Sequence, residues 1–183
     1  MKTIVNNYRK QFEYYKSLAD KTIAQLSSEQ LLIEYGPNSN SIAVIMKHIA
    51  GNLKSRWTNI FTTDGEKEWR NREQEFVLAD MSISELKVYW EDSWGVLFAT
   101  LDSISDTDLN TIIYIRNMGH TVQEAIVRQV SHYPYHVGQI VFAGKIILGD
   151  KFKSLSIPKG ASATYNAEKF AKDKSIKHFT DDL

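Results

Sequence analysis

The segment TVQEAIVRQVSHYPYHVGQIVFAGKIILG, residues 121–149, contains the longest helical pattern of the chain and decides the fold class. Thr121 and Glu124 have the spacing of a capping box, in which each side chain hydrogen-bonds the backbone of the other residue at the start of a helix. Gly149 is the residue type that most often follows the last turn of a helix, because it adopts a left-handed backbone without strain. These two signals predict a helix over residues 122–148.

Three other segments place apolar side chains at every third or fourth position, which is the pattern of an amphipathic helix. They cover residues 3–26, 41–61 and 82–101, and the last opens with a second capping box, Ser82-Ile83-Ser84-Glu85. We interpret the β-rich residues 111–115 as an extended loop and expect a short helix near residues 166–171. Four long helices without a convincing strand predict an all-α four-helix bundle.

The length of 183 residues suits one domain, because such a chain buries enough apolar surface to fold without disulfides or a structural metal. We therefore predict one domain over residues 1–183, with a bundle core at about 3–149 and a polar C-terminal extension at 150–183. The polar connection at residues 62–81 is about twenty residues long, which indicates a crossover or a functional loop. Its charged run, residues 64–75, is most simply a solvated loop.

The 22 Lys and Arg residues balance the 22 Asp and Glu residues, so the chain has no net charge to attract nucleic acid or an anionic membrane. The absence of cysteine excludes a thiol nucleophile, a redox CxxC pair, an iron–sulfur cluster and thiolate zinc sites. Any metal must therefore be held by His, Asp or Glu. The first residues lack the apolar region of a signal peptide, and no apolar run reaches about 18 residues. We therefore expect a cytoplasmic protein with neither a membrane nor a nucleic acid as partner.

Two of the five histidines, His132 and His136, lie four residues apart in the predicted helix 122–148, so their imidazoles project from one face. This spacing lets one helix supply two ligands to a tetrahedral metal ion. The alternative is a pair of partly buried histidines that are hydrogen-bonded to their neighbours. Pro134 lies between them, where it removes an N–H and frees a carbonyl of the helix. A proline inside a helix is an exception to the usual helix pattern, and it indicates either a functional site or a tolerated kink.

His48 lies beside the apolar stripe of the predicted helix 41–61, where a side chain can enter the bundle interior without displacing the core. By itself it also suits a surface or boundary position. Together with His132 and His136 it would place three neutral imidazoles around one divalent ion and leave a position open, which is typical of catalytic metal sites. Asn52 and Gln139 are candidates to support these ligands, although Gln139 equally suits a polar contact within the bundle.

Residues 131–140 resemble the fourth-helix signature of the DinB/YfiT-like superfamily of proposed metalloenzymes, in which His-x-x-x-His is followed by Gly-Gln-Ile. Residues 41–50 resemble the second-helix motif of that superfamily, which supplies the third histidine, here His48. Residues 119–122 and 155–160 look like those of an uncharacterised branch, a domain of unknown function. The resemblance therefore extends over essentially the whole chain.

The resemblance implies a four-helix bundle, commonly a homodimer, in which His48, His132 and His136 bind zinc, nickel or a similar divalent ion. Relatives of known activity use low-molecular-weight thiols, such as bacillithiol, mycothiol or glutathione, in S-transfer or thiol-dependent isomerisation. The implied function is a metal-dependent thiol S-transferase or detoxification enzyme, with a small thiol and an electrophile as partners. The alternative is a non-catalytic metal-binding or stress-response bundle that acts through protein interactions. Val137 stands where many relatives place Arg, which removes one candidate anion-binding group.

Overall fold

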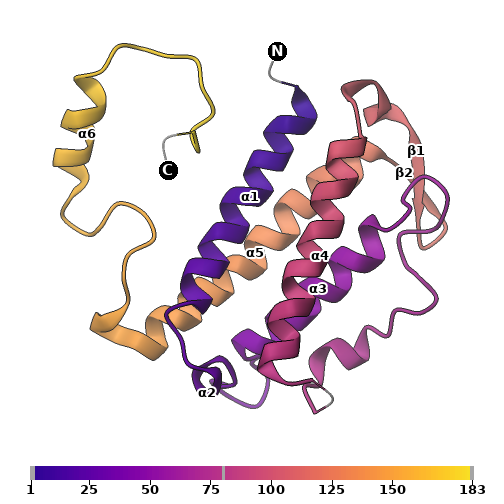
Figure 1. Cartoon of the computed structure of the whole chain (residues 1–183), viewed down its shortest axis with the longest axis horizontal. Coiled ribbons are helices and arrows are strands. Elements are labelled where there is room, and N and C mark those ends of the chain that lie inside the picture. Colours follow the sequence, from indigo (N-terminus) through magenta and orange to yellow (C-terminus); the bar gives the residue numbers. More distant parts are fainter. Residues whose placement is uncertain (1–2, 80, 182–183) are drawn as a thin grey trace.

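The structure, a computed structural model, describes residues 3–79 and 81–181, and this part of the chain is mostly helical with a small two-stranded sheet (Figure 1). The long helices are α1 (Ile4–Ile23), α3 (Ile42–Trp57), α4 (Ile83–Ser103) and α5 (Val122–Leu148). They confirm the four helices that the sequence predicts, with bounds that differ by a few residues at most. The shorter elements are α2 (Ser28–Leu31), η1 (Glu73–Phe76), η2 (Asp106–Asn110), β1 (Ile112–Ile115), β2 (Met118–Thr121), η3 (Gly149–Lys151) and α6 (Ser162–Phe170).

Capping boxes explain where α4 and α5 begin. The Thr121 hydroxyl accepts a hydrogen bond from the backbone N–H of Glu124, and the Glu124 carboxylate accepts one from the backbone of Thr121. Ser82 and Glu85 make the same reciprocal pair at the start of α4. These contacts satisfy backbone N–H groups that the first turn of a helix leaves without a partner.

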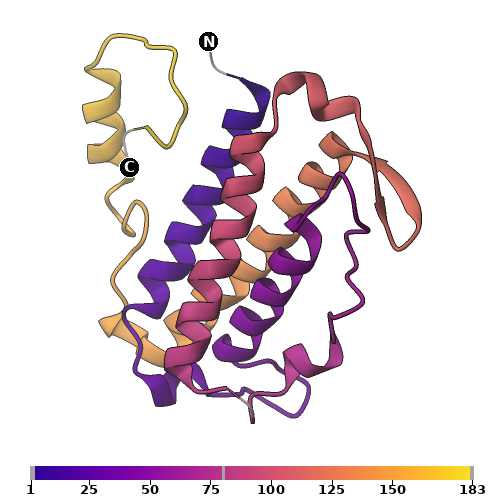
Figure 2. The same cartoon turned by 45° about the vertical axis from the view of Figure 1, so that its right-hand side comes forward.

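The four long helices pack side by side, α1 against α5 and α4, and α3 against α4 and α5 (Figure 2). Large aromatic side chains fill the space between them, and the fully buried ones are Phe12, Trp57, Trp90, Trp94 and Tyr133. Burying a large apolar side chain contributes about 1.5–3 kcal/mol. This aromatic core fixes the position of α5 relative to α3, and the candidate site described below lies between these two helices.

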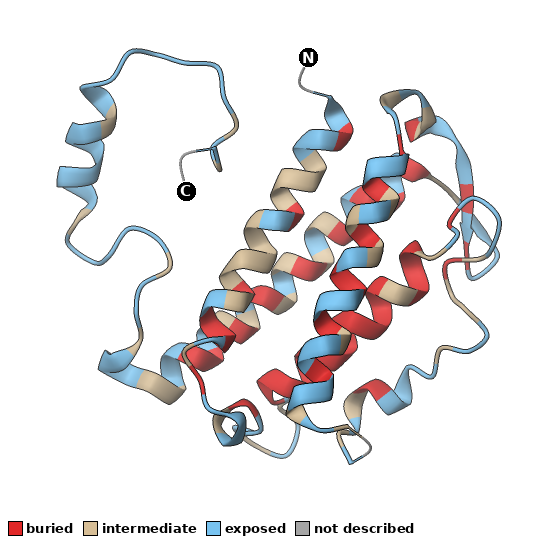
Figure 3. Cartoon of the chain, viewed as in Figure 1, coloured by how far each residue is buried: buried red, intermediate tan, exposed pale blue. Residues whose placement is uncertain are grey.

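Helix α3 is buried on almost every side, as Figure 3 shows by its red ribbon. Its apolar side faces the other long helices, and η1 of the segment 62–81 packs against it as well. The charged run 64–75 is therefore more than a solvated loop, since the side chains of Arg70 and Glu75 are buried. Buried polar groups need hydrogen-bonding or charged partners, and here the segment 62–81 supplies them.

Residues 111–115 form no extended loop, because β1 pairs with β2 in an antiparallel hairpin. The turn residues Arg116 and Asn117 have φ values of 56° and 60°, which is the left-handed backbone of a type I′ turn. Such turns usually contain Asn-Gly or Asp-Gly, so the Arg-Asn pair gave the sequence no clear hairpin signal. The Asp64 carboxylate accepts hydrogen bonds from the N–H groups of both turn residues, each at 2.8 Å. These two bonds hold the hairpin turn against the segment 62–81.

The C-terminal extension, as far as residue 181, carries α6, which confirms the short helix expected near residues 166–171 and begins four residues earlier, at Ser162. It lies on the side of α1 that faces away from the hairpin (Figures 1 and 2). Residues 1, 2, 182 and 183 of the predicted domain lie outside the described residues, as does residue 80 of the connection 62–81. Among the helices of the described ranges, none has the length and apolar character that a membrane span requires.

Candidate metal centre

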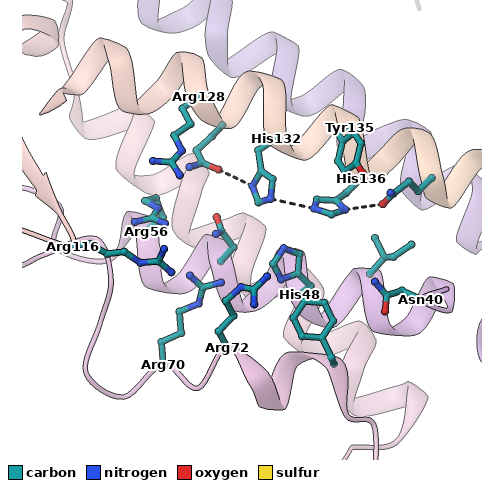
Figure 4. Close-up of a pocket in the computed structure, with 15 residues that line it drawn as sticks. Asn40, His48, Arg56, Arg70, Arg72, Arg116, Arg128, His132, Tyr135 and His136 are labelled. Carbon is teal, nitrogen blue, oxygen red and sulfur yellow. Dashed lines mark hydrogen bonds between the residues drawn. The ribbon is translucent and has the colours of Figure 1, made fainter. Parts of the chain in front are cut away.

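Three histidines that are far apart in the sequence meet where α3 packs against α5 (Figure 4). His48 comes from α3, and His132 and His136 come from one face of α5, one turn apart. Each ring offers a nitrogen that lies within 4.8 Å of the other two, and His132 Nε2 is 3.1 Å from His136 Nε2. A tetrahedral metal ion bound by two imidazoles separates their nitrogens by about 3.3 Å. The three histidines could therefore hold a metal ion.

The Nδ1 atom of each of the three imidazoles has an oxygen partner on the side away from the cluster. The partners are Glu75 Oε2 for His48 at 2.8 Å, Gln129 Oε1 for His132 at 3.1 Å and Gln139 Oε1 for His136 at 2.8 Å. Because a carboxylate or amide oxygen only accepts, the hydrogen of each neutral ring lies on Nδ1. The lone pair of each ring is then on Nε2, which is the arrangement found in metal-ligating histidines.

The close approach of His132 Nε2 and His136 Nε2 brings two lone pairs together. A hydrogen bond between them would require one Nε2 to carry a hydrogen, which is disfavoured because the oxygen partners place it on Nδ1. Protonation of the ring is disfavoured too, since burial and the nearby rings of His136 and His48 lower the pKa of His132 to about 4. Burial also lowers the pKa of His136. A cation between the two nitrogens would resolve this contact, so the donor set fits a divalent metal.

Glu75, which no sequence motif indicates, is the acceptor for His48. Its side chain is 7% exposed and also forms an ion pair with Arg70, Nε to Oε1 at 2.7 Å. Burial by itself would raise the pKa of the Glu75 carboxyl, but the hydrogen bonds from His48 and Arg70 outweigh it and lower the pKa. Glu75 therefore stays ionised beside His48 and fixes the orientation of its ring. Its position in a run of charged residues concealed it from sequence analysis.

Gly51 on α3 allows this carboxylate to approach the helix, because a Cβ at that position would overlap the Glu75 side chain. We expect Gly51→Ala to displace Glu75 and to lower the free energy of unfolding by about 1–3 kcal/mol, as measured by urea denaturation. Gly95→Ala is the matched control, since a Cβ there meets nothing within 4 Å. The control should be stabilised by about 1 kcal/mol, because alanine favours a helix more than glycine does. Equal gains in the two variants would contradict the role of Gly51.

Asn52 lines the same cavity as the histidines but is directed to another partner. Its side-chain oxygen accepts a hydrogen bond from the Tyr133 hydroxyl at 3.0 Å, and that hydroxyl accepts one from Trp57 Nε1 at 3.1 Å. Tyr133 is fully buried, and burial raises its pKa. Asn52 thus connects the aromatic core to the cavity wall. Pro134 lies inside α5, which continues as a helix on both sides of it.

The other two histidines lie outside the cluster. His120 belongs to β2 and directly precedes Thr121, the N-cap of α5. His178 lies in the C-terminal extension, where its ring contacts the Thr180 hydroxyl. Neither belongs to the three-histidine group that the described residues form.

A cavity of about 520 Å³ adjoins the three histidines. Five arginines line it together with them, and Figure 4 shows these arginines gathered on one side of the histidines: Arg56, Arg70, Arg72, Arg116 and Arg128. The sequence motifs point to an arginine only at position 137, and the residue there, Val137, is buried in the hydrophobic core. The arginines come from four separate parts of the chain, so no local motif could have shown that they meet.

Gln139→Leu should lower the affinity for a divalent metal by about 10–100-fold, because the His136 ring loses the acceptor that fixes its tautomer. Metal titration by calorimetry checks this value. Gln123→Leu, on the exposed side of the same helix, is the control and should bind metal like the wild type. A metal affinity that stays unchanged in Gln139→Leu would mean that this contact has no influence on the site.

The metal-free protein should lose stability as the pH falls from about 6.5 towards 4. His132 has its pKa lowered from 6.5 to about 4 in the folded chain, so in this range the unfolded chain binds more protons. The resulting stabilisation is complete above pH 6.5 and is lost as the pH falls through the folded pKa. Thermal unfolding of wild type and His132→Gln between pH 7 and pH 4 checks this, and the variant should lose less. Parallel curves for the two proteins would refute the assignment to His132.

Comparison with known proteins identifies a family for this chain but no activity. A family model described as "Protein of unknown function (DUF1572)" matches residues 1–161, a range that includes all three histidines and the five arginines of the cavity. A search of curated proteins finds no match.

Proposed function

The chain belongs to the DUF1572 family, whose description names no activity, and we propose that its function depends on a divalent metal ion held by His48, His132 and His136. We propose further that it is a DinB-like metalloenzyme, a thiol S-transferase that binds zinc or nickel and takes a low-molecular-weight thiol such as bacillithiol. The resemblance of residues 41–50 and 131–140 to the DinB motifs supports this assignment. So does the packing of the four long helices, with the histidines between α3 and α5.

The observation that carries the proposal is the 3.1 Å approach of two imidazole Nε2 atoms whose Nδ1 atoms both face oxygen acceptors. This arrangement costs free energy in a protein without a cation, because two lone pairs face each other. Three protein nitrogens are the ligand number of a catalytic zinc-type site, since they leave a position open for water or substrate. A divalent ion bound there would supply Lewis acidity, which favours ionisation of a thiol or water that coordinates it.

The residues around the cluster prepare this site. Glu75, Gln129 and Gln139 hold the Nδ1 hydrogens, which keeps the three rings in the tautomer and orientation that direct Nε2 inwards. Phe76 stacks on the His48 ring with the ring centroids 5.2 Å apart and shields that ring from water. A cavity of about 520 Å³ is large enough for a small-molecule substrate.

The absence of cysteine means that the sulfur of an S-transfer reaction has to come from a diffusible thiol. In the proposed reaction the thiol loses its proton to solvent, and its sulfur attacks an electrophilic carbon. A carbon–sulfur bond forms, and the leaving group departs with its electron pair. We also propose a homodimer in the cytoplasm, in keeping with the resemblance, with no nucleic acid or membrane as partner.

The test combines metal analysis with a reaction panel. Untagged protein should contain about one zinc or nickel ion per chain, by the ligand count of such sites. The loaded protein should consume 1-chloro-2,4-dinitrobenzene or monobromobimane faster with bacillithiol, mycothiol or glutathione than the thiol alone does in buffer. His136→Ala should lose both the metal and the acceleration. Bound metal without acceleration for any thiol would overturn the enzyme proposal and favour the non-catalytic bundle.

A further inference from the structure

The cavity beside the histidines is positively charged although the chain as a whole is neutral. Five of its lining side chains are arginines, and no carboxylate lines it among the residues that the structure describes. Arg56 comes from α3, Arg70 and Arg72 from the segment 62–81, Arg116 from the hairpin turn and Arg128 from α5. Guanidinium groups that converge on a cavity are the usual means of binding carboxylate or phosphate groups.

The carboxylates behind these arginines compensate them only in part. In the described residues their ion pairs involve three carboxylates. Glu66 lies 3.0 Å from Arg70, 3.4 Å from Arg116 and 3.7 Å from Arg56. Glu75 pairs with Arg70, and Glu73 pairs with Arg72. A single oxygen, Glu66 Oε2, is shared by three guanidinium groups. The five guanidinium groups of the cavity face the three carboxylates of these ion pairs, a surplus of two positive charges.

Arg56 is the buried arginine whose bonding is least complete. It is 5% exposed, yet its Nε and Nη1 atoms have no hydrogen-bond partner, and Glu66 lies 3.7 Å away from its Nη2. Arginine is rarely buried unless a charged partner accepts its hydrogen bonds. Since Arg56 lines the cavity, an anion that enters the cavity would add the close charged partner that this guanidinium lacks.

The backbone of Arg116 is held in place before any ligand arrives. Its own backbone N–H and that of Asn117 donate to the Asp64 carboxylate, which anchors the hairpin turn. The Gly65 N–H donates to the Tyr114 carbonyl at 2.8 Å, which joins the hairpin and the segment 62–81 a second time. Preorganised donors bind an anion more tightly than flexible ones, because less conformational entropy is lost on binding.

We propose that Arg56, Arg116 and Arg128 form a binding subsite for a doubly charged oxyanion, a phosphate or dicarboxylate group, on the small molecule that occupies this cavity. The surplus of two positive charges matches a ligand group that carries two negative charges. Because the three histidines line the same cavity, the rest of the ligand would lie beside the proposed metal position (Figure 4). That the bound molecule is a substrate rests on the proposed function. The oxyanion itself needs only the arginines.

Calorimetric titration of the protein as purified, with inorganic phosphate and separately with malonate, tests the subsite at low ionic strength. We expect saturable binding of at least one of the two anions. Arg128→Gln should weaken anion binding by about tenfold or more, because the charge of Arg128 faces the cavity. Arg128 is exposed on α5, so the substitution should leave the fold intact. Lys145→Gln removes one positive charge from the same helix outside the cavity lining, and it should bind like the wild type. Binding of phosphate alone or malonate alone identifies which oxyanion the subsite takes.

No saturable binding of either anion, or equal affinity in Arg128→Gln and Lys145→Gln, would overturn the inference. Arg116→Gln is the second exposed variant and should show the same loss as Arg128→Gln. His136→Ala separates this inference from the proposed function. If that variant loses its metal but keeps its anion affinity, the arginine subsite acts independently of the metal. Anion affinity that disappears together with the metal would mean that the anion binds the metal and not the arginines, and would also overturn the inference.

Discussion

Replacement of His136 by alanine is expected to lower the affinity for zinc or nickel by more than about a hundredfold, since a lost ligand costs more than the 10–100-fold of a lost outer contact. The variant retains two imidazoles, which leaves too few protein ligands for a stable catalytic-type site. Elemental analysis of untagged protein and calorimetric titration of the chelated protein measure the effect. His48→Ala should behave in the same way, although His48 comes from another helix.

The control for this prediction is His178→Ala, which removes a histidine outside the cluster. It should retain the metal content and the affinity of the wild type. If His136→Ala or His48→Ala keeps its metal, the ion is not held by these three histidines, and the proposed mechanism loses its basis.

Glu75→Ala is expected to destabilise the fold by about 3–5 kcal/mol, the cost of removing one partner of a buried ion pair. The Arg70 side chain is 3% exposed and would lose its 2.7 Å partner, and His48 would lose its Nδ1 acceptor. Urea denaturation of the metal-free protein measures the loss. Metal affinity should fall as well, by about 10–100-fold, because the His48 ring is no longer held in position.

Glu73→Ala tests the same 3-10 helix without the buried contacts, since the Glu73 side chain is 84% exposed. It should change the free energy of unfolding by no more than about 0.5 kcal/mol. A loss below about 1 kcal/mol in Glu75→Ala, close to that of Glu73→Ala, would show that Glu66, the other ion-pair partner of Arg70, is sufficient for its charge and that Glu75 does not organise the site.

The four long helices could be predicted because the information for a helix is local. The capping pairs Thr121 with Glu124 and Ser82 with Glu85 lie three residues apart, and the apolar stripes repeat every third or fourth residue. The hairpin could not be predicted in this way. Its turn uses Arg116 and Asn117, and contacts to Asp64, about fifty positions earlier in the chain, hold that turn in place.

The sequence by itself determined that His132 and His136 lie on one face of one helix, because a separation of four residues is close to one helical turn. It also determined that no cysteine takes part in the chemistry. The tertiary structure alone decided that Glu75 orients His48 and that five arginines share the cavity with the histidines. These groups come from segments up to about 90 residues apart, and only the packing of α3, α5, the hairpin and the segment 62–81 brings them together. Contacts of that kind depend on how the whole chain folds, and no local spacing encodes them.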